Sequence, residues 1–178
     1  MPKSCNNTAD QLPYVALRAM EPEDLDVLYE IENDAEMWHV GAVNVPYSRY
    51  LLHDYIAHAT GDIYTDRQVR LMIENAEGQC VGLVDLVDFN PQHNRAEVGI
   101  IIQRGYRRCG YATEALKLML HYARKVIHLH QVYAVVSVAN IPSLHLLKSL
   151  GFSDNVVLRD WLCDEGAFID AHLLQYFL

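Results

Sequence analysis

A basic loop containing glycine is the stretch of this sequence whose residue types best suit a chemical task. It reads Arg107-Arg108-Cys109-Gly110-Tyr111-Ala112 and follows an apolar run that ends at Ile102. From Thr113 onward, apolar residues recur at helical spacing. A strand, a basic loop and a helix start together present backbone N–H groups and a positive dipole end to a phosphate. The pattern therefore predicts a pyrophosphate site. The alternative is an ordinary turn with solvated arginines.

Two other kinds of phosphate loop do not fit these residues. The glycines at 105 and 110 have the spacing of a nucleoside-triphosphate loop, but Tyr111-Ala112 stands where Lys-Ser/Thr is required. The dinucleotide fingerprint is absent as well. The histidine pairs lack metal-ligand spacing, and no metal site is expected. The loop should neutralise phosphate with arginines and backbone amides alone.

The motif Arg107-x-x-Gly110-x-Ala112 matches the Q/R-x-x-G-x-G/A signature of the GNAT superfamily of acyl-CoA N-acyltransferases. The resemblance covers nearly the whole chain. It is most similar to spermidine N-acetyltransferases through the segments 82–88, 95–97 and 100–102 and through Asn90. Ribosomal-protein N-terminal acetyltransferases share much of this pattern. The resemblance implies an acyltransferase of class EC 2.3.1 that uses acetyl-CoA as its co-substrate.

The fold class implied is mixed α/β (α+β, with a mixed sheet), in the order β-α-α-β-β-β-α-β-α-β-β. The residue pattern agrees with this order. Strands are expected near residues 14–18, 68–74, 80–89, 97–102, 132–138, 152–159 and 167–178. Helices are expected from about residue 22, across 50–61, from 113 to 125, and from Pro142 to Gly151.

The resemblance also implies which residues hold the coenzyme. In this family the strand before the basic loop splays from its parallel neighbour, and its main chain pairs with the pantetheine arm. The loop holds the pyrophosphate, and the start of a later helix lies beside the far wall of the coenzyme site. The corresponding positions here are Ile100, Ile101, Ile102, Arg107, Arg108, Cys109, Gly110, Tyr111, Ala112, Thr113, Asn140 and Ser143. The isoleucine side chains themselves are expected to be core.

Acidic residues near that strand are candidates for handling the acceptor amine. A protonated amine cannot attack a thioester, so a base must deprotonate it, and Glu97 in its apolar strand is the leading candidate. Asp85 and Asp88 are candidate ligands for a cationic acceptor, and His93 is a candidate proton relay. The alternatives are an ion pair of Glu97 with Arg95 or Arg70, and a solvated hairpin face for the aspartates.

Two positions in the motif region raise separate expectations. Many GNAT enzymes carry a tyrosine where Leu147 stands, and that phenol is usually assigned to protonate the leaving thiolate. Leucine cannot donate a proton, so another donor, a water or direct release of the thiolate is required.

Cys109 lies beside two arginines and a helix start, which should lower its pKa and make it a reactive thiol.

Composition limits the partners. With 178 residues, of which 51% are hydrophobic, the chain fits one domain over 1–178, with residues 1–12 expected to be disordered. The net charge of −9 disfavours nucleic acid and suits a cationic acceptor. No apolar run reaches the roughly 20 residues of a membrane span. The absence of a leader sequence and the scattered cysteines favour a cytoplasmic setting.

The sequence thus predicts an acetyl-CoA-dependent N-acetyltransferase acting on a primary amine in a ternary complex. The acceptor is a small-molecule amine, such as spermidine or an aminoglycoside, or a protein N-terminus, and self-association into a homo-oligomer remains open. A longer acyl-CoA is also compatible with the sequence. The rival hypothesis is a catalytically degenerate acetyl-CoA-binding sensor or structural module. The leucine at position 147 favours this rival.

Overall fold

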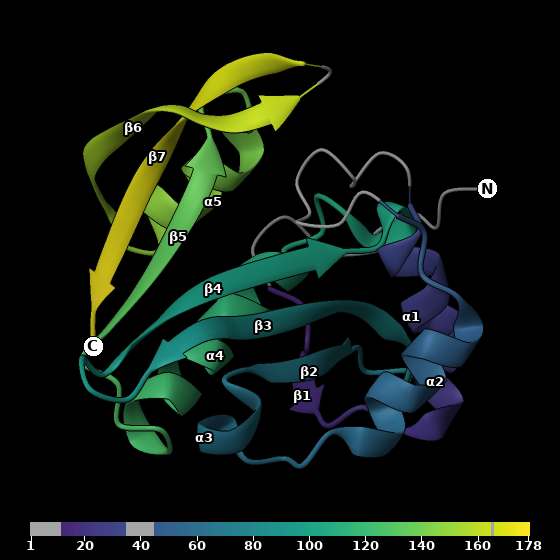
Figure 1. The fold of residues 1–178 in the computed structure, drawn as a ribbon. Helices are drawn as coiled ribbons and strands as arrows, with labels where there is room; N and C mark the ends of the chain where they lie inside the picture. The colour runs from purple at the N-terminus through teal and green to yellow at the C-terminus, as the bar shows by residue number, and fades with distance from the viewer. Residues whose placement is uncertain (1–11, 35–44, 165) are drawn as a thin grey trace.

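The protein is built on one seven-stranded mixed sheet with the strand order β1-β2-β3-β4-β5-β7-β6 (Figure 1). This computed structural model describes residues 12–34, 45–164 and 166–178. Disorder was expected for residues 1–12. Of these, residues 1–11 lie outside the described residues, and only Leu12 lies within them. No helix in the described ranges is both long and apolar enough to span a bilayer.

The elements follow the predicted order. The strands are β1 (Ala16–Arg18), β2 (Val69–Glu74), β3 (Cys80–Asn90), β4 (Arg95–Ile102), β5 (Gln131–Ser137), β6 (Ser153–Asp164) and β7 (Ala167–Phe177). The helices are α1 (Leu25–Glu32), α2 (Arg49–His58), α3 (Ile63–Asp66), α4 (Tyr111–Lys125) and α5 (Ile141–Ser149), with 3-10 turns at Pro22–Asp24 and Arg104–Tyr106. The mixed α/β prediction is confirmed.

Two elements differ from the expectation. Helix α3 was not predicted, because its four residues are too few to show a helical repeat; a capping bond fixes it instead, as the Asp62 side chain accepts from the Tyr64 N–H at 3.1 Å. Strand β6 runs on to Asp164, past the predicted end at residue 159. Register shifts between Leu158 and Leu162 interrupt its alternation, which hides its second half from pattern reading.

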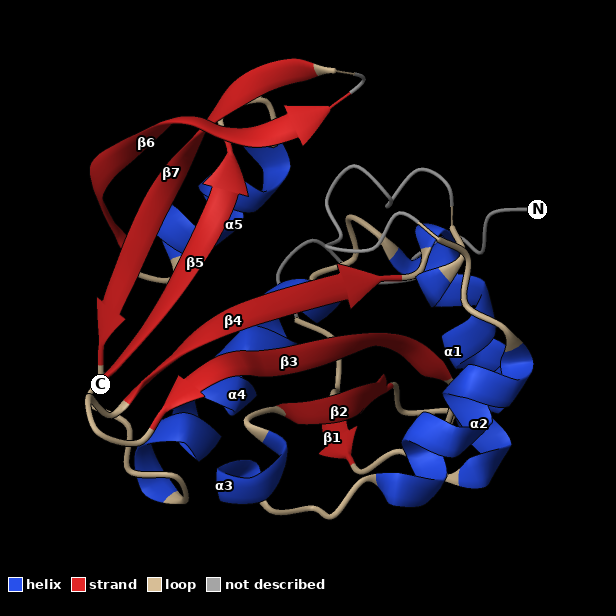
Figure 2. Cartoon of the chain, in the orientation of Figure 1, coloured by secondary structure: helices blue, strands red, loops and turns tan. Residues whose placement is uncertain are grey.

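The two faces of the sheet are covered by different helices. Helices α4 and α5 cover one face, and their core includes Val84, Val98 and Leu116 (Figure 2). Helices α1 and α2 cover the other face through a smaller core that includes Leu28 and Leu83. Because side chains alternate along a strand, each residue of β4 faces one of these two layers.

Strands β4 and β5 part from each other after a short parallel contact. Their ladder joins only residues 95–97 to residues 131–133. Beyond it, β4 stays paired with β3 as far as Ile102, and β5 stays paired with β7 as far as Ser137. Each strand is thus held by its other neighbour, and the two diverge as a fork that closes at Glu97 and Tyr133 (Figure 1). The splay implied by the family resemblance is confirmed.

Candidate active site

The inner edge of β4 is one wall of the fork. Ile100 and Ile102 pack against the core under α4, and Ile101 packs against the core under α1 and α2. Their side chains are core, as expected, while the main chain facing β5 has no ladder partner among the described residues. An open strand edge is suited to pair with an extended ligand.

The basic loop lies at the open end of the fork and leads into α4. The Arg107 side chain donates from Nε to the Ile102 carbonyl oxygen at 2.9 Å, which ties the loop to the end of β4. Arg108 is exposed and has a φ of +63°. Gly110, with a φ of +86°, is the N-cap of α4, a backbone region that glycine adopts without strain.

The first turn of α4 fits a phosphate ligand. Glycine has no side chain with which to cap the helix, and no described residue accepts a hydrogen bond from the N–H groups of Tyr111, Ala112 and Thr113. Such N–H groups, together with the helix dipole and neighbouring arginines, favour an anion. The residues present therefore fit the diphosphate of a coenzyme.

Cys109 corrects one expectation. The structure shows it disulfide-bonded, whereas Cys80 and Cys163 are free thiols. It is not the reactive thiol that its neighbours suggested. Its place among the candidate coenzyme residues depends on its position in the loop alone.

Asn140 and Ser143 act together at the start of α5. The Asn140 side-chain oxygen accepts from the Ser143 N–H at 3.2 Å, which makes Asn140 the N-cap of the helix. Their three-residue spacing is that of a helix cap. Since α5 begins just after the end of β5, this cap lies at the open end of the fork, like the start of α4 (Figure 1).

Glu97 lies where the fork closes. Its carboxylate accepts from the Val135 N–H at 3.3 Å and so reaches β5 just past the last ladder pair. Burial raises the pKa of Glu97; the Val135 N–H opposes this shift, and the negative charge of Asp88 adds to it. A half-buried carboxylate with a raised pKa is suited to accept a proton near neutral pH. The suggested ion pair with Arg95 or Arg70 is not the contact recorded for it.

Asp85 is buried, so the solvated-face alternative is wrong for this residue. Both of its carboxylate oxygens accept from Arg70, each at 2.9 Å, and Arg70 also contacts Glu32 at 2.5 Å. Burial acts to lower the pKa of Arg70, but the charges of Asp85 and Glu32 outweigh it and raise that pKa. The carboxylate is thus already paired, and the cluster of three side chains has a net charge of −1.

Asp88 and His93 lie near the β3–β4 turn. Both side chains are exposed, and the His93 N–H donates to the Asn90 side chain at 3.0 Å. The Asp88 carboxylate accepts from the Tyr133 hydroxyl at 2.5 Å. The structure therefore brings Asp88 toward Glu97, while His93 has only this local backbone contact recorded. Sequence reasoning missed Tyr133, since nothing in the local pattern of β5 signals a partner on β3.

Leu147 gives the site no proton donor. Its side chain is buried in the core beneath α5 together with Leu144. The described residues also contain no group of three or more His, Cys, Asp or Glu side chains arranged to hold a metal ion.

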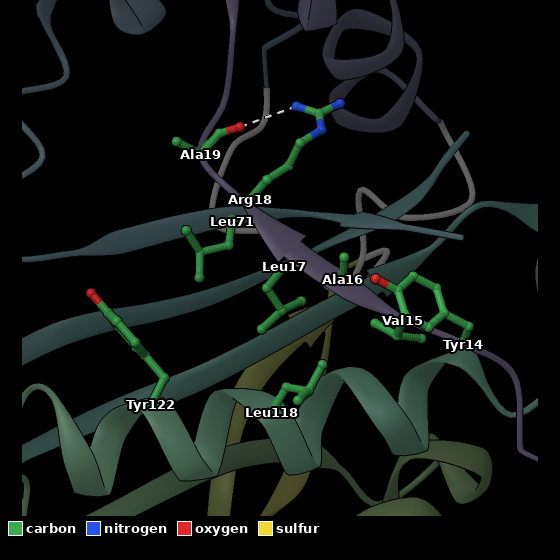
Figure 3. Close-up of a pocket in the computed structure, with 9 residues that line it drawn as sticks. All are labelled: Tyr14, Val15, Ala16, Leu17, Arg18, Ala19, Leu71, Leu118 and Tyr122. Carbon is green, nitrogen blue, oxygen red and sulfur yellow. Dashed lines mark hydrogen bonds between the residues drawn. The ribbon is translucent and has the colours of Figure 1, made fainter. Parts of the chain in front are cut away.

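One cavity lies away from the fork, and a second borders the end of β4. The larger, of about 440 Å³, lies between β1 and α4, with Leu118 and Tyr122 directed from α4 toward the strand (Figure 3). Its one charged lining residue, Arg18, is already bonded to Asp24 and Glu74. A second cavity of about 250 Å³ lies between the end of α1 and residues 101–107. Neither contains Glu97, so we assign the chemistry to the fork.

Comparison with known proteins identifies the family. The model of the acetyltransferase (GNAT) domain family matches residues 15–153. The chain belongs to the GNAT acetyltransferase family. It is therefore an N-acetyltransferase whose co-substrate is acetyl-CoA, as the motif around Gly110 led us to expect.

Several GNAT relatives are spermidine N-acetyltransferases. The spermidine N(1)-acetyltransferase of Escherichia coli K12 is 34% identical over 143 residues, which cover 78% of this chain and 73% of the relative. A crystal structure of the Vibrio cholerae spermidine N-acetyltransferase with CoA and spermine has a TM-score of 0.81 and 26% identity, covering 92% and 95% of the two chains. Another structure of that protein is described as dodecameric and has a TM-score of 0.77.

A protein N-terminal acetyltransferase is also similar, over a shorter stretch. The N-alpha-acetyltransferase of Sulfurisphaera tokodaii is 36% identical over 75 residues, or 42% of this chain and 45% of the relative. Polyamine and N-terminal acetyltransferases therefore both occur among the relatives of this GNAT chain.

Proposed function

We propose that this GNAT enzyme transfers the acetyl group of acetyl-CoA to a primary amine of a polyamine such as spermidine. Glu97 carries the proposal, because a half-buried carboxylate with a raised pKa stands where the fork closes. The identity to the E. coli relative over most of the chain supports a polyamine acceptor over a protein N-terminus, whose relative aligns over less than half of it.

In the proposed mechanism both substrates bind before transfer. The open edge of β4 and the first turn of α4 hold the coenzyme, which supplies the activated acetyl group. Glu97 takes a proton from the bound ammonium, and the neutral amine then attacks the thioester carbonyl directly. The C–S bond breaks as the amide forms, and the remaining excess proton on the nitrogen passes to water. Because Leu147 has no proton to give, the thiolate leaves without a protein acid; a thiol pKa of about 8.5 makes that departure tolerable.

The rival hypothesis is a degenerate acetyl-CoA-binding sensor, and Leu147 favours it. Release of free thiol from acetyl-CoA, measured with spermidine, a basic peptide with a free N-terminus and an aminoglycoside, distinguishes the hypotheses. We expect turnover with spermidine. Tight coenzyme binding without turnover on any of the three amines would support the sensor instead.

The variant Glu97→Gln tests the base. We expect kcat to fall by about 10²-fold or more, as for loss of a general base, while the KM for acetyl-CoA stays unchanged. Glu77→Gln, which changes an exposed turn residue in the same way, is the matched control. Arg108→Glu should instead raise the KM for acetyl-CoA. Equal loss of coenzyme binding in the Glu97 and Arg108 variants would contradict this division of roles.

We further propose that the chain assembles as a homo-oligomer, since the V. cholerae relative is described as dodecameric. Light scattering of the purified protein tests this, and a monomer at micromolar concentration would contradict it.

A further inference from the structure

A side-chain bridge crosses β4 beside Glu97. The Tyr133 hydroxyl on β5 donates to the Asp88 carboxylate on β3 at 2.5 Å. Strand β4 lies between these two strands, and Glu97 is the ladder partner of Tyr133 on one side and of Val87 on the other. Ladder partners project to the same face of a sheet, so the bridge and the Glu97 side chain share one face.

A β-bulge makes the bridge possible. Between the pairs Val87–Glu97 and Asn90–Arg95, β3 has two residues where β4 has one. Asp88 is one of these two and has a φ of +49°, a left-handed conformation that is uncommon for a non-glycine residue. The other, Phe89, is buried in the core under α4. Strict alternation would send Asp88 to the α4 face, and the extra residue instead lets it reach Tyr133.

The surroundings of Tyr133 fix the direction of this hydrogen bond. Burial raises the pKa of Tyr133, and the bond to Asp88 and the charges of Glu97 and Asp88 raise it further, against a smaller opposite effect of Arg95. The phenol therefore stays protonated and donates to Asp88. The carboxylates of Asp88 and Glu97 remain as hydrogen-bond acceptors near the Tyr133 hydroxyl.

We propose that Tyr133 is a positioning residue that holds Asp88 beside Glu97, so that Asp88 anchors a second ammonium group of the acceptor while Glu97 receives the reacting one. This inference rests on the proposed amine acetylation at Glu97. Neighbouring strands lie about 4.8 Å apart, so carboxylates on adjacent strands suit two amines joined by a short aliphatic chain. The pair would thus favour diamines and polyamines over monoamines.

The charged groups around the bridge provide a second test of this inference, through the pKa of Glu97. Asp88 on β3 and Glu97 and Arg95 on β4 act on the Tyr133 hydroxyl. The next row of the same face holds Asp85, whose carboxylate is already bound by Arg70, which also binds Glu32. Asp88 is the one neighbouring charge that raises the pKa of Glu97 in the described structure. Removal or displacement of this charge should therefore lower that pKa.

The test compares Tyr133→Phe and Asp88→Asn with the wild type, using spermidine and a monoamine of similar chain length. We expect the KM for spermidine to rise about tenfold in each variant, the loss expected for one charge-assisted contact. The KM for the monoamine and for acetyl-CoA should stay within twofold. The acid limb of kcat/KM should move to lower pH, more in Asp88→Asn than in Tyr133→Phe. Tyr64→Phe, which removes an exposed hydroxyl from α3, is the matched control.

Calorimetric titration of spermidine into the protein without coenzyme separates this inference from the proposed function. Weaker binding in Tyr133→Phe supports the inference even if no amine is acetylated. Equal losses for spermidine and the monoamine, or a variant with wild-type KM and pH profile, would overturn it while leaving the acetylation intact. Absence of spermidine binding by the wild type would overturn it as well. Thermal unfolding of each variant shows whether it is folded.

Discussion

Two glycines on the β3–β4 hairpin differ in what surrounds them. A Cβ on Gly82 would lie 2.1 Å from the Ile101 carbonyl oxygen, well inside contact distance. A Cβ on Gly99 would meet only the Asp85 Cβ at 3.9 Å, an ordinary contact. Gly82 therefore permits the close approach of β3 to the wall of the fork, while Gly99 leaves space on the face shared by Asp85 and Glu97.

At the residue scale, we predict that Gly82→Ala and Gly99→Ala have different effects. Gly82→Ala should destabilise the fold by about 1–3 kcal/mol, the usual cost of overpacking, and raise the KM for acetyl-CoA because the edge at Ile101 must shift. Gly99→Ala should change stability by under about 1 kcal/mol, since the added methyl fits. Urea unfolding measures both. Similar stabilities for the two variants would show that the approach at Gly82 is not tight in solution.

At the element scale, the cap of α5 is open to test. Asn140→Ala removes the oxygen that accepts from the Ser143 N–H and should cost about 1 kcal/mol of unfolding free energy. Asn140→Asp keeps an accepting oxygen and places a negative charge at the helix start, so it should retain stability. Chemical unfolding of the three proteins measures these differences. Wild-type stability of Asn140→Ala would mean that the cap contributes nothing, and an equal loss in both variants would mean that the accepting oxygen is not the stabilising group.

Most elements were predictable because their signals are local. The apolar stripe of α4 and the alternation of β2 each lie within one window of sequence, and both elements were found nearly to their ends. Helix α3 and the end of β6 were missed because one is a single capped turn and the other is broken by bulges. Pattern reading fails where a bond or an extra residue replaces periodicity.

The candidate site was predictable in part. Glu97 and the loop around Gly110 were found through their residue types and the family signature. The partners of the aspartates were not found: Arg70 binds Asp85 through the register of β2 on β3, and Tyr133 reaches Asp88 across a third strand. Such contacts depend on register and on a bulge, which local residue patterns do not reveal.

At the scale of the whole molecule, the fork separates two kinds of charge. The arginine loop and the uncapped start of α4 lie at its open end, and Glu97 and Asp88 lie where it closes. The sequence has a net charge of −9. An anionic coenzyme and a cationic acceptor can thus each meet a complementary part of one sheet, while the overall field favours only the cation.

This arrangement predicts different responses of the two substrates to salt. Raising the ionic strength from about 10 to 150 mM shortens the screening length from about 30 to 8 Å. The kcat/KM for spermidine should then fall several-fold, because both the net charge of −9 and the carboxylates attract it. The kcat/KM for acetyl-CoA should change less or rise, since screening weakens long-range repulsion as well as attraction at Arg108. A monoamine acceptor, with less charge than spermidine, provides the control and should show a smaller fall. Parallel declines for spermidine and acetyl-CoA would mean that salt acts on the protein as a whole and not through the separated charges.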